Sequence, residues 1–161
     1  LRSSAAFSSL LPNAQLDAAV SRSFDNAFEI FQNEISSGTL SKTTVLAIGV
    51  NSLDHYQEDI QQFIDALPDG SRLIIVTPYN VSDEAKVKQA RDYELSLPKT
   101  YNYITIADWY KTATSHPEIW NGTDGVHYSD ANTTGADLYV KTIQKAIDKS
   151  AKRPAKGESN S

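Results

Sequence analysis

The sequence RLIIVT, from Arg72 to Thr77, is a continuous apolar run that decides the fold class. The turn signal Pro68-Asp69-Gly70 precedes it, and the run is short, so it predicts a buried strand. Two further β-branched apolar runs, TTVLAI at 43–48 and YITIA at 103–107, have the same character. Strands that are apolar on both faces are typical of a parallel sheet with helices on either side.

Helical patterns alternate with these strands along the chain. Apolar residues recur at helical spacing from Phe24 to Ile35, with Ser23 as a capping residue and Gly38 as the stop. The remaining predicted elements are a helix at 2–11, a strand at Ala14–Val20, and helices at 53–67, 82–97 and 135–149. We therefore expect one α/β domain over residues 1–149. The polar stretch SAKRPAKGESNS at 150–161 lacks apolar periodicity and predicts a disordered tail.

Composition excludes several classes of protein. The 161 residues are 40% apolar and 22% charged, as in one globular domain. The net charge of -5 argues against a nucleic-acid binder, although the residues from Lys149 onward carry four Lys or Arg and one Glu. There is no cysteine, and no apolar run is long enough to span a membrane. Methionine is also absent, even at position 1, so we expect that processing removed a preceding segment.

Candidate site residues follow the predicted strands, because ligands bind at the carboxyl ends of the strands in such sheets. Asp124 and His127 are three positions apart in a turn opened by Gly125. A carboxylate that accepts the imidazole Nδ1 proton leaves Nε2 free to act as a base. The alternative is a surface turn with a chance histidine, which is the commoner origin of this spacing.

A second group of candidates could stabilise an oxyanion. Gly49 allows close backbone approach after a buried strand, and the Asn51 amide can donate a hydrogen bond. Both residue types also favour plain turns. Ser21 could offer its backbone N–H, or it could simply cap a helix.

The other polar and aromatic candidates have plainer interpretations. His55 and His116 lack carboxylate neighbours at a useful spacing, and Asp108 is typical of a helix cap. Trp109, Tyr110 and Trp120 either line a groove for sugar rings or anchor loops to the core. No metal motif or glycine-rich phosphate loop occurs in the sequence, so we expect no metal and no cofactor.

Taken together, Gly49-Val50-Asn51 and Asp124-Gly125-Val126-His127 resemble the SGNH/GDSL hydrolase family. Within it, the chain looks most like the extracytoplasmic catalytic domain of Gram-positive peptidoglycan O-acetyltransferases. The narrower match lies in Leu11-Pro12-Asn13-Ala14, Ala19-Val20-Ser21-Arg22 and the segment from Asp124 to Tyr128. The resemblance covers nearly all of 1–149 and implies a three-layer α/β/α sandwich with a parallel, flavodoxin-like sheet.

The resemblance also implies roles for individual residues. Asp124 and His127 match the acid and the base of a catalytic triad, and Asn51 and the Ser21 N–H match the oxyanion donors. The residues expected to border the substrate are Gly49, Arg22 and Tyr128. The implied activity is serine-dependent transfer of acetyl, through an acetyl-enzyme, to the C6 hydroxyl of muramic acid in peptidoglycan. The alternatives are a carbohydrate or lipid esterase of the same family and a catalytically silent glycan-binding domain.

One element of the family pattern is missing. Its nucleophile is the serine of a Gly-Asp-Ser or Ala-Asp-Ser motif that ends a first strand, and neither motif occurs here. We expect this serine and its strand just upstream of Leu1, since Ser3 and Ser4 lie in a helical pattern with no strand before it. A gap is then expected between the strands at 14–20 and 43–48.

The resemblance finally implies partners and a location. The glycan strands of peptidoglycan are the expected acceptor. A membrane acyltransferase domain of the same protein is expected to supply the acetyl groups. The catalytic domain would then lie outside the cytoplasm, attached to the cell membrane through the rest of the protein.

Overall fold

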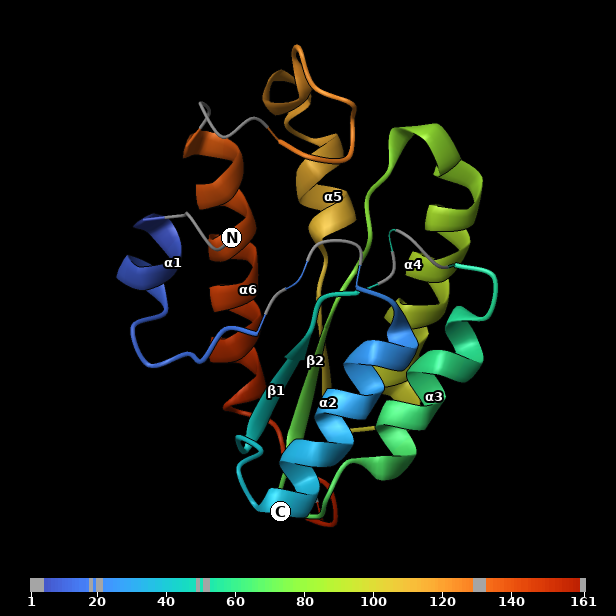
Figure 1. Cartoon of the computed structure of the whole chain (residues 1–161), viewed down its shortest axis with the longest axis vertical. Helices are drawn as coiled ribbons and strands as arrows, with labels where there is room; N and C mark the ends of the chain where they lie inside the picture. Colours follow the sequence, from blue (N-terminus) through green and yellow to red (C-terminus); the bar gives the residue numbers. More distant parts are fainter. Residues whose placement is uncertain are drawn as a thin grey trace.

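Within the described residues, three parallel strands form a sheet in the order β1-β2-β3 (Figure 1). They are β1 (Thr43–Leu46), β2 (Arg72–Val76) and β3 (Ile104–Ala107). Thr43 pairs with Arg72 and Leu73 pairs with Ile104, so the strands share one carboxyl edge. The structure is a computed structural model and describes residues 5–17, 19, 22–48, 50, 53–128 and 133–159.

Helices cover both faces of this sheet (Figure 1). On one face lie α2 (Phe24–Ser37), α3 (Tyr56–Ala66) and α4 (Glu84–Thr100). On the other lie α1 (Ala5–Leu10), α5 (Trp109–Thr114) and α6 (Thr133–Ser150). Two short 3-10 helices are η1 (Val81–Asp83) and η2 (Pro117–Trp120). The predicted α/β fold, with a parallel sheet between helices, is confirmed.

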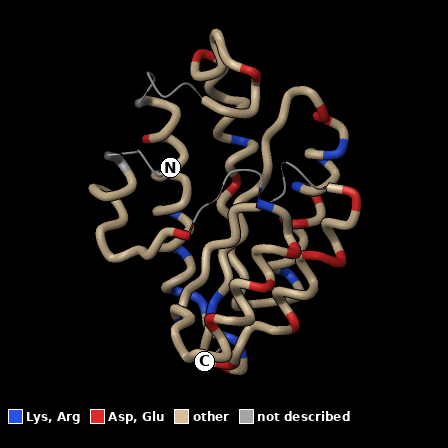
Figure 2. Tube along the Cα trace, in the orientation of Figure 1, with Lys and Arg blue, Asp and Glu red and all other residues tan. Residues whose placement is uncertain are grey.

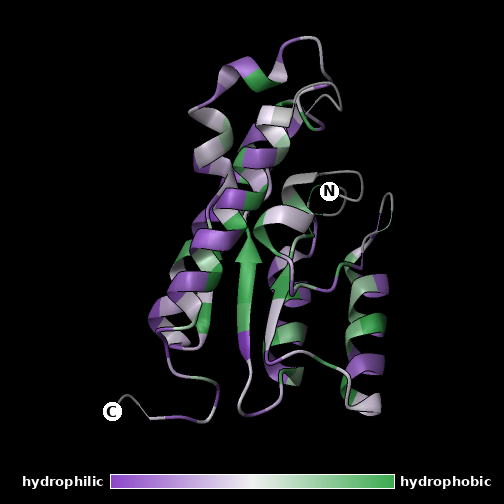
Figure 3. Ribbon diagram, turned by 90° about the vertical axis from the view of Figure 1, so that its left-hand side faces the viewer, coloured by the Kyte–Doolittle hydropathy of each residue, from purple (hydrophilic) through white to green (hydrophobic). Residues whose placement is uncertain are grey.

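The strand β2 explains why the sequence lacks an alternating pattern there. Leu73 and Ile75 face the core beneath α2 and α3, whereas Ile74 and Val76 face the core beneath α5 and α6. All four are 3% exposed or less. Figure 3 accordingly shows the strands mostly in green, while the helices mix green and purple.

The ends of α2 follow the predicted signals. The side chain of Ser23 accepts a hydrogen bond from the Asn26 N–H at 3.3 Å, which satisfies one of the free donors of the first turn. Gly38 ends the helix with φ 71°, the left-handed conformation that glycine adopts without a steric cost. The predicted cap and stop are therefore confirmed.

The predicted strand at 14–20 is wrong for the residues described there. Residues 14–17 and 19 belong to no strand, and all of them except Leu16 are exposed. The Ala14 N–H closes a turn on the Leu11 carbonyl at 3.1 Å instead. A strand needs a neighbour for its backbone donors and acceptors, and no described residue pairs with this segment in a ladder.

The predicted disordered tail is wrong for residues 151–159. Ala155 is 1% exposed, and Lys156 exchanges backbone hydrogen bonds of 2.9 Å with Gly70 and Ser71 ahead of β2. The Lys156 ammonium also donates to three carbonyls at the end of α3, within 64–67, at 2.9, 3.2 and 2.7 Å. Charged side chains dock this segment, and such docking leaves no apolar periodicity to recognise.

Charge is distributed as unevenly in space as it is in the sequence. Figure 2 shows Lys and Arg positions near the C-terminus, at the amino edge of the sheet, and many Asp and Glu positions along α2 and α3. No helix within the described ranges is both long and apolar enough to cross a membrane.

Candidate active site

The turn from Asp124 to His127 lies between η2 and α6, beyond the carboxyl edge of the sheet. Thr123 prepares it, because its N–H and its hydroxyl both donate to the Trp120 carbonyl, at 3.1 and 2.9 Å. The Thr123 hydroxyl oxygen then accepts the Gly125 N–H at 3.1 Å. Gly125 has φ 75°, so the sharp change of direction requires glycine.

Asp124 uses both carboxylate oxygens within this turn. Its Oδ1 accepts the backbone N–H groups of Val126 and His127, at 2.9 and 2.8 Å. Its Oδ2 lies 2.8 Å from His127 Nδ1. The turn therefore fixes the carboxylate first and leaves one oxygen to orient the imidazole, with Nε2 pointing away from the pair.

These hydrogen bonds determine the charge of Asp124. The His127 N–H, then the His127 imidazole and then the Val126 N–H hold the pKa of the Asp124 carboxyl well below its usual range. Asp124 is consequently ionised at neutral pH, and it can stabilise a positive charge that develops on His127.

Both side chains are open to solvent. The His127 side chain is 82% exposed and that of Asp124 is 59% exposed. Among the described residues, no hydroxyl group hydrogen-bonds to His127. The pair can orient and accept a proton, but the group that would give up that proton is not among its described contacts.

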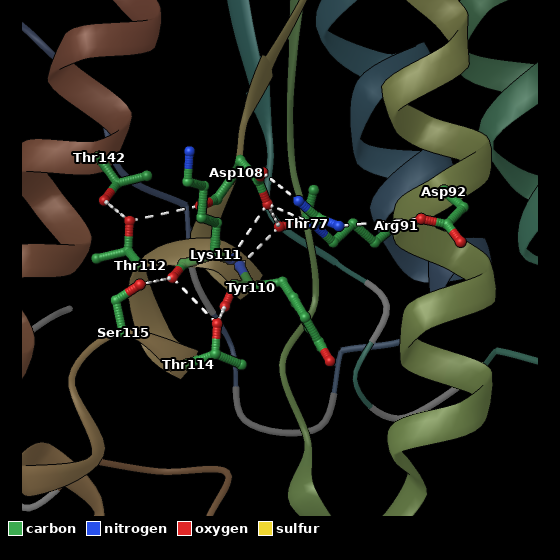
Figure 4. A network of polar contacts seen from close by, with 10 residues as sticks. All are labelled: Thr77, Arg91, Asp92, Asp108, Tyr110, Lys111, Thr112, Thr114, Ser115 and Thr142. Atoms are coloured by element: carbon green, nitrogen blue, oxygen red, sulfur yellow. Dashed lines mark hydrogen bonds and ion pairs between the residues drawn. The ribbon is translucent and has the colours of Figure 1, made fainter.

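A second polar network lies at the ends of β2 and β3 (Figure 4). Arg91 of α4 forms a two-point contact with Asp108, Nε to Oδ1 at 2.8 Å and Nη2 to Oδ2 at 2.7 Å. The hydroxyl of Thr77 donates to Asp108 at 3.3 Å and accepts the Tyr110 N–H at 2.8 Å. The network joins α4, the end of β2 and the start of α5.

Asp108 is a structural anchor in this network. Burial opposes its ionisation, but hydrogen bonds from Arg91, the Lys111 N–H and Thr77 together lower its pKa. Asp108 Oδ1 accepts the Lys111 N–H at 3.2 Å, so it also caps α5. The prediction of a capping role is confirmed, and Arg91 is the partner that sequence reasoning missed.

The prediction that His116 lacks a carboxylate neighbour is wrong. His116 Nδ1 lies 2.8 Å from Glu118 Oε1, the same separation as in the Asp124–His127 pair. Pro117 starts η2 between the two residues and folds the glutamate back toward the imidazole. The spacing of two residues was the signal in the sequence, but it required this 3-10 turn to be useful.

His55 lies apart from both pairs. It stands at the start of α3, in an exposed position, and makes no capping bond with its side chain. A hollow of about 360 Å³ opens here, lined by Ser23, Phe24, Asp25, His55, Glu58 and Asp59.

The other predicted site residues divide into two sets. Ser21, Gly49 and Asn51 lie outside the described residues, so their roles stay predictions. Arg22 is described, and its guanidinium pairs with the Asp17 carboxylate at 2.7 Å. Tyr128 is described as well, and its ring packs edge-on against Trp109 at 6.2 Å.

The aromatic residues favour loop anchoring over a sugar groove. Trp109 is only 5% exposed and packs edge-on against Tyr139, with ring centres 4.9 Å apart. Trp120 stacks on Tyr79 at 4.6 Å, and its Nε1 donates to the Ala113 carbonyl at 3.1 Å. These contacts tie η2, and hence the Asp124–His127 turn, to α5 and the sheet.

Glu94 is a further residue that the sequence pattern did not reveal. It lies in the helix predicted at 82–97, and it is 2% exposed. Its Oε2 has no hydrogen-bond partner within the described part of the chain. Burial, followed by the nearby Asp108 charge, raises the pKa of Glu94 well above the usual value. Glu94 falls at helical spacing with Val87, Ala90 and Leu97, and this spacing was the signal in the sequence for its burial.

No three His, Asp or Glu side chains are grouped to hold a metal ion in the described ranges. No protein-family profile matches the chain. The chain is similar to a solved structure, the C-terminal catalytic domain of Streptococcus pneumoniae peptidoglycan O-acetyltransferase A (OatA) with a methylsulfonyl adduct. The two are 39% identical with a TM-score of 0.89, over 95% of this chain and 89% of that one.

Curated relatives point the same way. The O-acetyltransferases OatA of Staphylococcus aureus strains NCTC 8325 / PS 47 and COL are each 24% identical to this chain over 147 residues. The match covers 86% of this chain but 22% of each relative, so the chain spans about a fifth of their length.

Proposed function

Because the chain belongs to the family of OatA catalytic domains, we propose that it carries the acid–base pair of a peptidoglycan O-acetyltransferase. The observation that carries this proposal is the geometry of one carboxylate. Asp124 accepts two backbone N–H groups through Oδ1 and holds His127 Nδ1 at 2.8 Å through Oδ2. Such a pair presents Nε2 as a base and stabilises the imidazolium that forms.

The proposed reaction has two steps. A serine hydroxyl attacks the carbonyl carbon of an acetyl donor and gives its proton to His127 Nε2, and the imidazolium then protonates the departing group. In the second step, the C6 hydroxyl of a muramic acid residue attacks the acetyl-serine and gives its proton to the same nitrogen. That proton returns to the serine oxygen as the new ester leaves.

The oxyanion of each tetrahedral intermediate needs donors nearby. We assign this role to the Asn51 side chain and the Ser21 backbone N–H, both on the strength of the family resemblance. Gly49, Arg22 and Tyr128 are proposed to border the substrate. The Arg22 guanidinium already pairs with Asp17, so any contact with substrate would extend that ion pair.

We further propose that the nucleophilic serine lies on a strand beside β1, which completes a flavodoxin-like order. Within the described residues β1 pairs only with β2, and its other edge is unpaired. Val45 of this strand is 36% exposed, and the Thr44 hydroxyl is buried without a partner. A free strand edge presents unpaired backbone N–H and C=O groups with which a further strand can pair.

Covalent labelling tests the proposal. The full-length protein is treated with methanesulfonyl fluoride, which leaves a methylsulfonyl group on an activated nucleophile. We expect one group per molecule on wild type and on His116→Ala at equal rates. His127→Ala should react at least about 100-fold more slowly, because it lacks the base. Equal labelling of His127→Ala would contradict the assignment. Peptide mapping of the label then locates the serine, and a described serine would contradict the placement beside β1.

A second candidate function is hydrolysis of the acetyl-enzyme. The observation that favours it is the 82% exposure of the His127 side chain, which gives water access to the base. Transfer and hydrolysis are separated by supplying a muramic acid acceptor and comparing ester product with free acetate. A catalytically silent glycan-binding domain is the remaining alternative, and the labelling experiment would reveal it by the absence of any adduct.

The setting of the reaction is also a proposal. The names of the relatives support peptidoglycan glycan strands as the acetyl acceptor. We propose that a membrane acyltransferase domain of the same protein delivers the acetyl group. The catalytic domain would then act outside the cytoplasm while attached to the cell membrane.

A further inference from the structure

The Asp124–His127 turn touches neighbouring elements through two glycines, one on each side of the histidine. The side chains of the pair are mostly exposed, so burial does not hold them in place. Gly125 faces η1, and Gly135 of α6 faces Tyr128, the residue after His127. These two contacts therefore join the segment around His127 to η1 and α6.

On the first side, Gly125 lies against Val81. A Cβ placed on Gly125 would collide with Val81 Cγ1 and lie 3.2 Å from its Cβ. The Val81 N–H also donates to the Gly125 carbonyl in a long hydrogen bond of 3.4 Å. Val81 is itself held in η1, because the Asn80 side chain caps this turn by accepting the Ser82 N–H at 2.9 Å.

Val81, the apolar side chain in this contact, is largely exposed. At 56% it is the most exposed of the large apolar side chains recorded as exposed in the described ranges. An apolar side chain in this position gains little from burial. Its contact with Gly125 is therefore the feature that links Val81 to the turn.

On the second side, Tyr128 lies against Gly135. A Cβ placed on Gly135 would lie 2.7 Å from Tyr128 Cβ and 2.8 Å from its Cγ, which is closer than carbon atoms that are not bonded to each other can approach. The Tyr128 ring also packs against Trp109 and Tyr139, each at a centroid distance of 6.2 Å. The residue after His127 is thus seated on α6 by a glycine and held by aromatic rings.

We propose that Val81 and Gly135 are positioning residues that set the orientation of His127 by clamping its turn between η1 and α6. The inference rests on the proposed function of the Asp124–His127 pair. It adds that η1, which follows β2, couples the carboxyl end of the central strand to the base. A displacement of about 1 Å at such a base can cost about 100-fold in rate, so small changes at the two contacts should be visible in turnover.

The test is a double-variant cycle in the full-length protein with an aryl acetate as substrate. Gly125→Ala is expected to lower kcat by about 100-fold with KM little changed. Gly122→Ala is the matched control, since Gly122 has φ 73° in the same loop but no atom within 4 Å of the added methyl group. It carries the same backbone strain without the collision, and a smaller loss is expected.

Val81→Ala then separates collision from strain. Alone, it should lower kcat by about tenfold, because the turn loses its support. Combined with Gly125→Ala, it should recover about tenfold of the loss, because the conflicting methyl group is gone. Leu95→Ala removes another exposed apolar side chain, 37% exposed on α4, and should leave kcat unchanged. On the α6 side, Gly135→Ala is expected to lower kcat by about tenfold.

A second readout does not depend on activity. The 13C signal of the Asp124 carboxyl reports its pKa, and loosening of the turn in Val81→Ala should raise that pKa toward the usual range. The clamp is overturned if the fold-loss in kcat of the double variant equals the product of the two single losses and the pKa of Asp124 does not change in Val81→Ala. That outcome would leave the proposed function intact. Retained turnover in His127→Ala would instead overturn the proposed function. The pKa of Asp124 in Val81→Ala would still test whether Val81 holds the turn.

Discussion

At the carboxyl edge of the sheet, His127 is 82% exposed and held by hydrogen bonds within its own turn. At the amino edge, the Lys156 ammonium donates hydrogen bonds to three carbonyls around the end of α3, which lie far from it in the sequence. Polar contacts thus act within a single turn around His127, whereas those of Lys156 join segments that are far apart in the sequence.

The difference teaches where stability and chemistry are separated in this fold. A turn closed by hydrogen bonds between near neighbours can present a reactive pair without contributing to the core. The tail is fixed by contacts with residues about 90 positions away in the sequence. It packs at the amino edge of the sheet, so we expect it to contribute to the stability of the whole domain. We therefore expect substitutions of Asp124 and His127 to lower activity with little change in stability, and substitutions that break the docking of Lys156 to do the reverse.

The largest effect is expected from His127→Ala. Turnover of an aryl acetate by the full-length protein should fall by about 10⁶, as when the base of a triad is removed. The midpoint of thermal unfolding should change little because the imidazole is exposed. His116→Ala is the matched control, since its imidazole also lies 2.8 Å from a carboxylate oxygen. Retained turnover in His127→Ala together with a loss in His116→Ala would reverse the assignment.

Asp124→Asn is expected to give the next largest effect, a loss of about 10⁴ in kcat, because the amide no longer fixes the correct imidazole tautomer. The amide oxygen can still accept the N–H groups of Val126 and His127, so the turn should persist. Glu118→Gln changes the second pair in the same way and should retain wild-type turnover. A loss of less than about tenfold in Asp124→Asn would show that the carboxylate does not orient the base.

How much of this could be predicted from the sequence depends on the range of the contacts. The RLIIVT run gave β2 to within one residue, and Ser23 and Gly38 bound α2 as expected, because these are local signals. The Asp124–His127 pair was also predictable, since both residues lie in one turn. The ion pair of Arg91 and Asp108 was not, because only the packing of α4 against β3 brings the two together.

The errors have the same origin. Residues 14–17 and 19 include alanine and aspartate, which are depleted in strands, and a strand exists only where a neighbour pairs with it. The tail at 151–159 lacks apolar periodicity, yet Arg153 donates to the carbonyls of Asn102 and Pro98, at 2.7 and 3.2 Å. Docking by isolated charged side chains has no repeat that a sequence pattern could show.

At the amino edge, Lys156→Met should destabilise the domain. The change keeps the aliphatic stem but removes a charged donor from three carbonyls, and we expect a loss of about 1–3 kcal/mol in the free energy of unfolding. Lys152→Met is the matched control, because this exposed residue lies four positions earlier in the same tail. Urea unfolding of both variants measures the difference. Activity at temperatures well below unfolding should be unchanged in both, and equal stability of the two variants would mean that the tail contact contributes nothing.

The smallest effect concerns Glu94, which lies in the sheet-facing stripe of α4 and belongs to neither edge. Burial, and then the charge of Asp108, raises its pKa well above the usual 4.5, so the folded state holds a proton that the unfolded state releases. The free energy of unfolding should therefore fall as pH rises above about 4.5, by up to about 1.4 kcal/mol per pH unit across the interval between the unfolded and folded pKa values.

Glu94→Gln removes this titration. Because its amide is also buried, we expect a net gain of only about 1 kcal/mol at neutral pH, and no gain below the usual pKa. Glu29→Gln removes the same charge from an exposed position and controls for net charge. Urea unfolding at acid and neutral pH measures the gain, and a gain of the same size at both would show that Glu94 is not protonated in the folded protein.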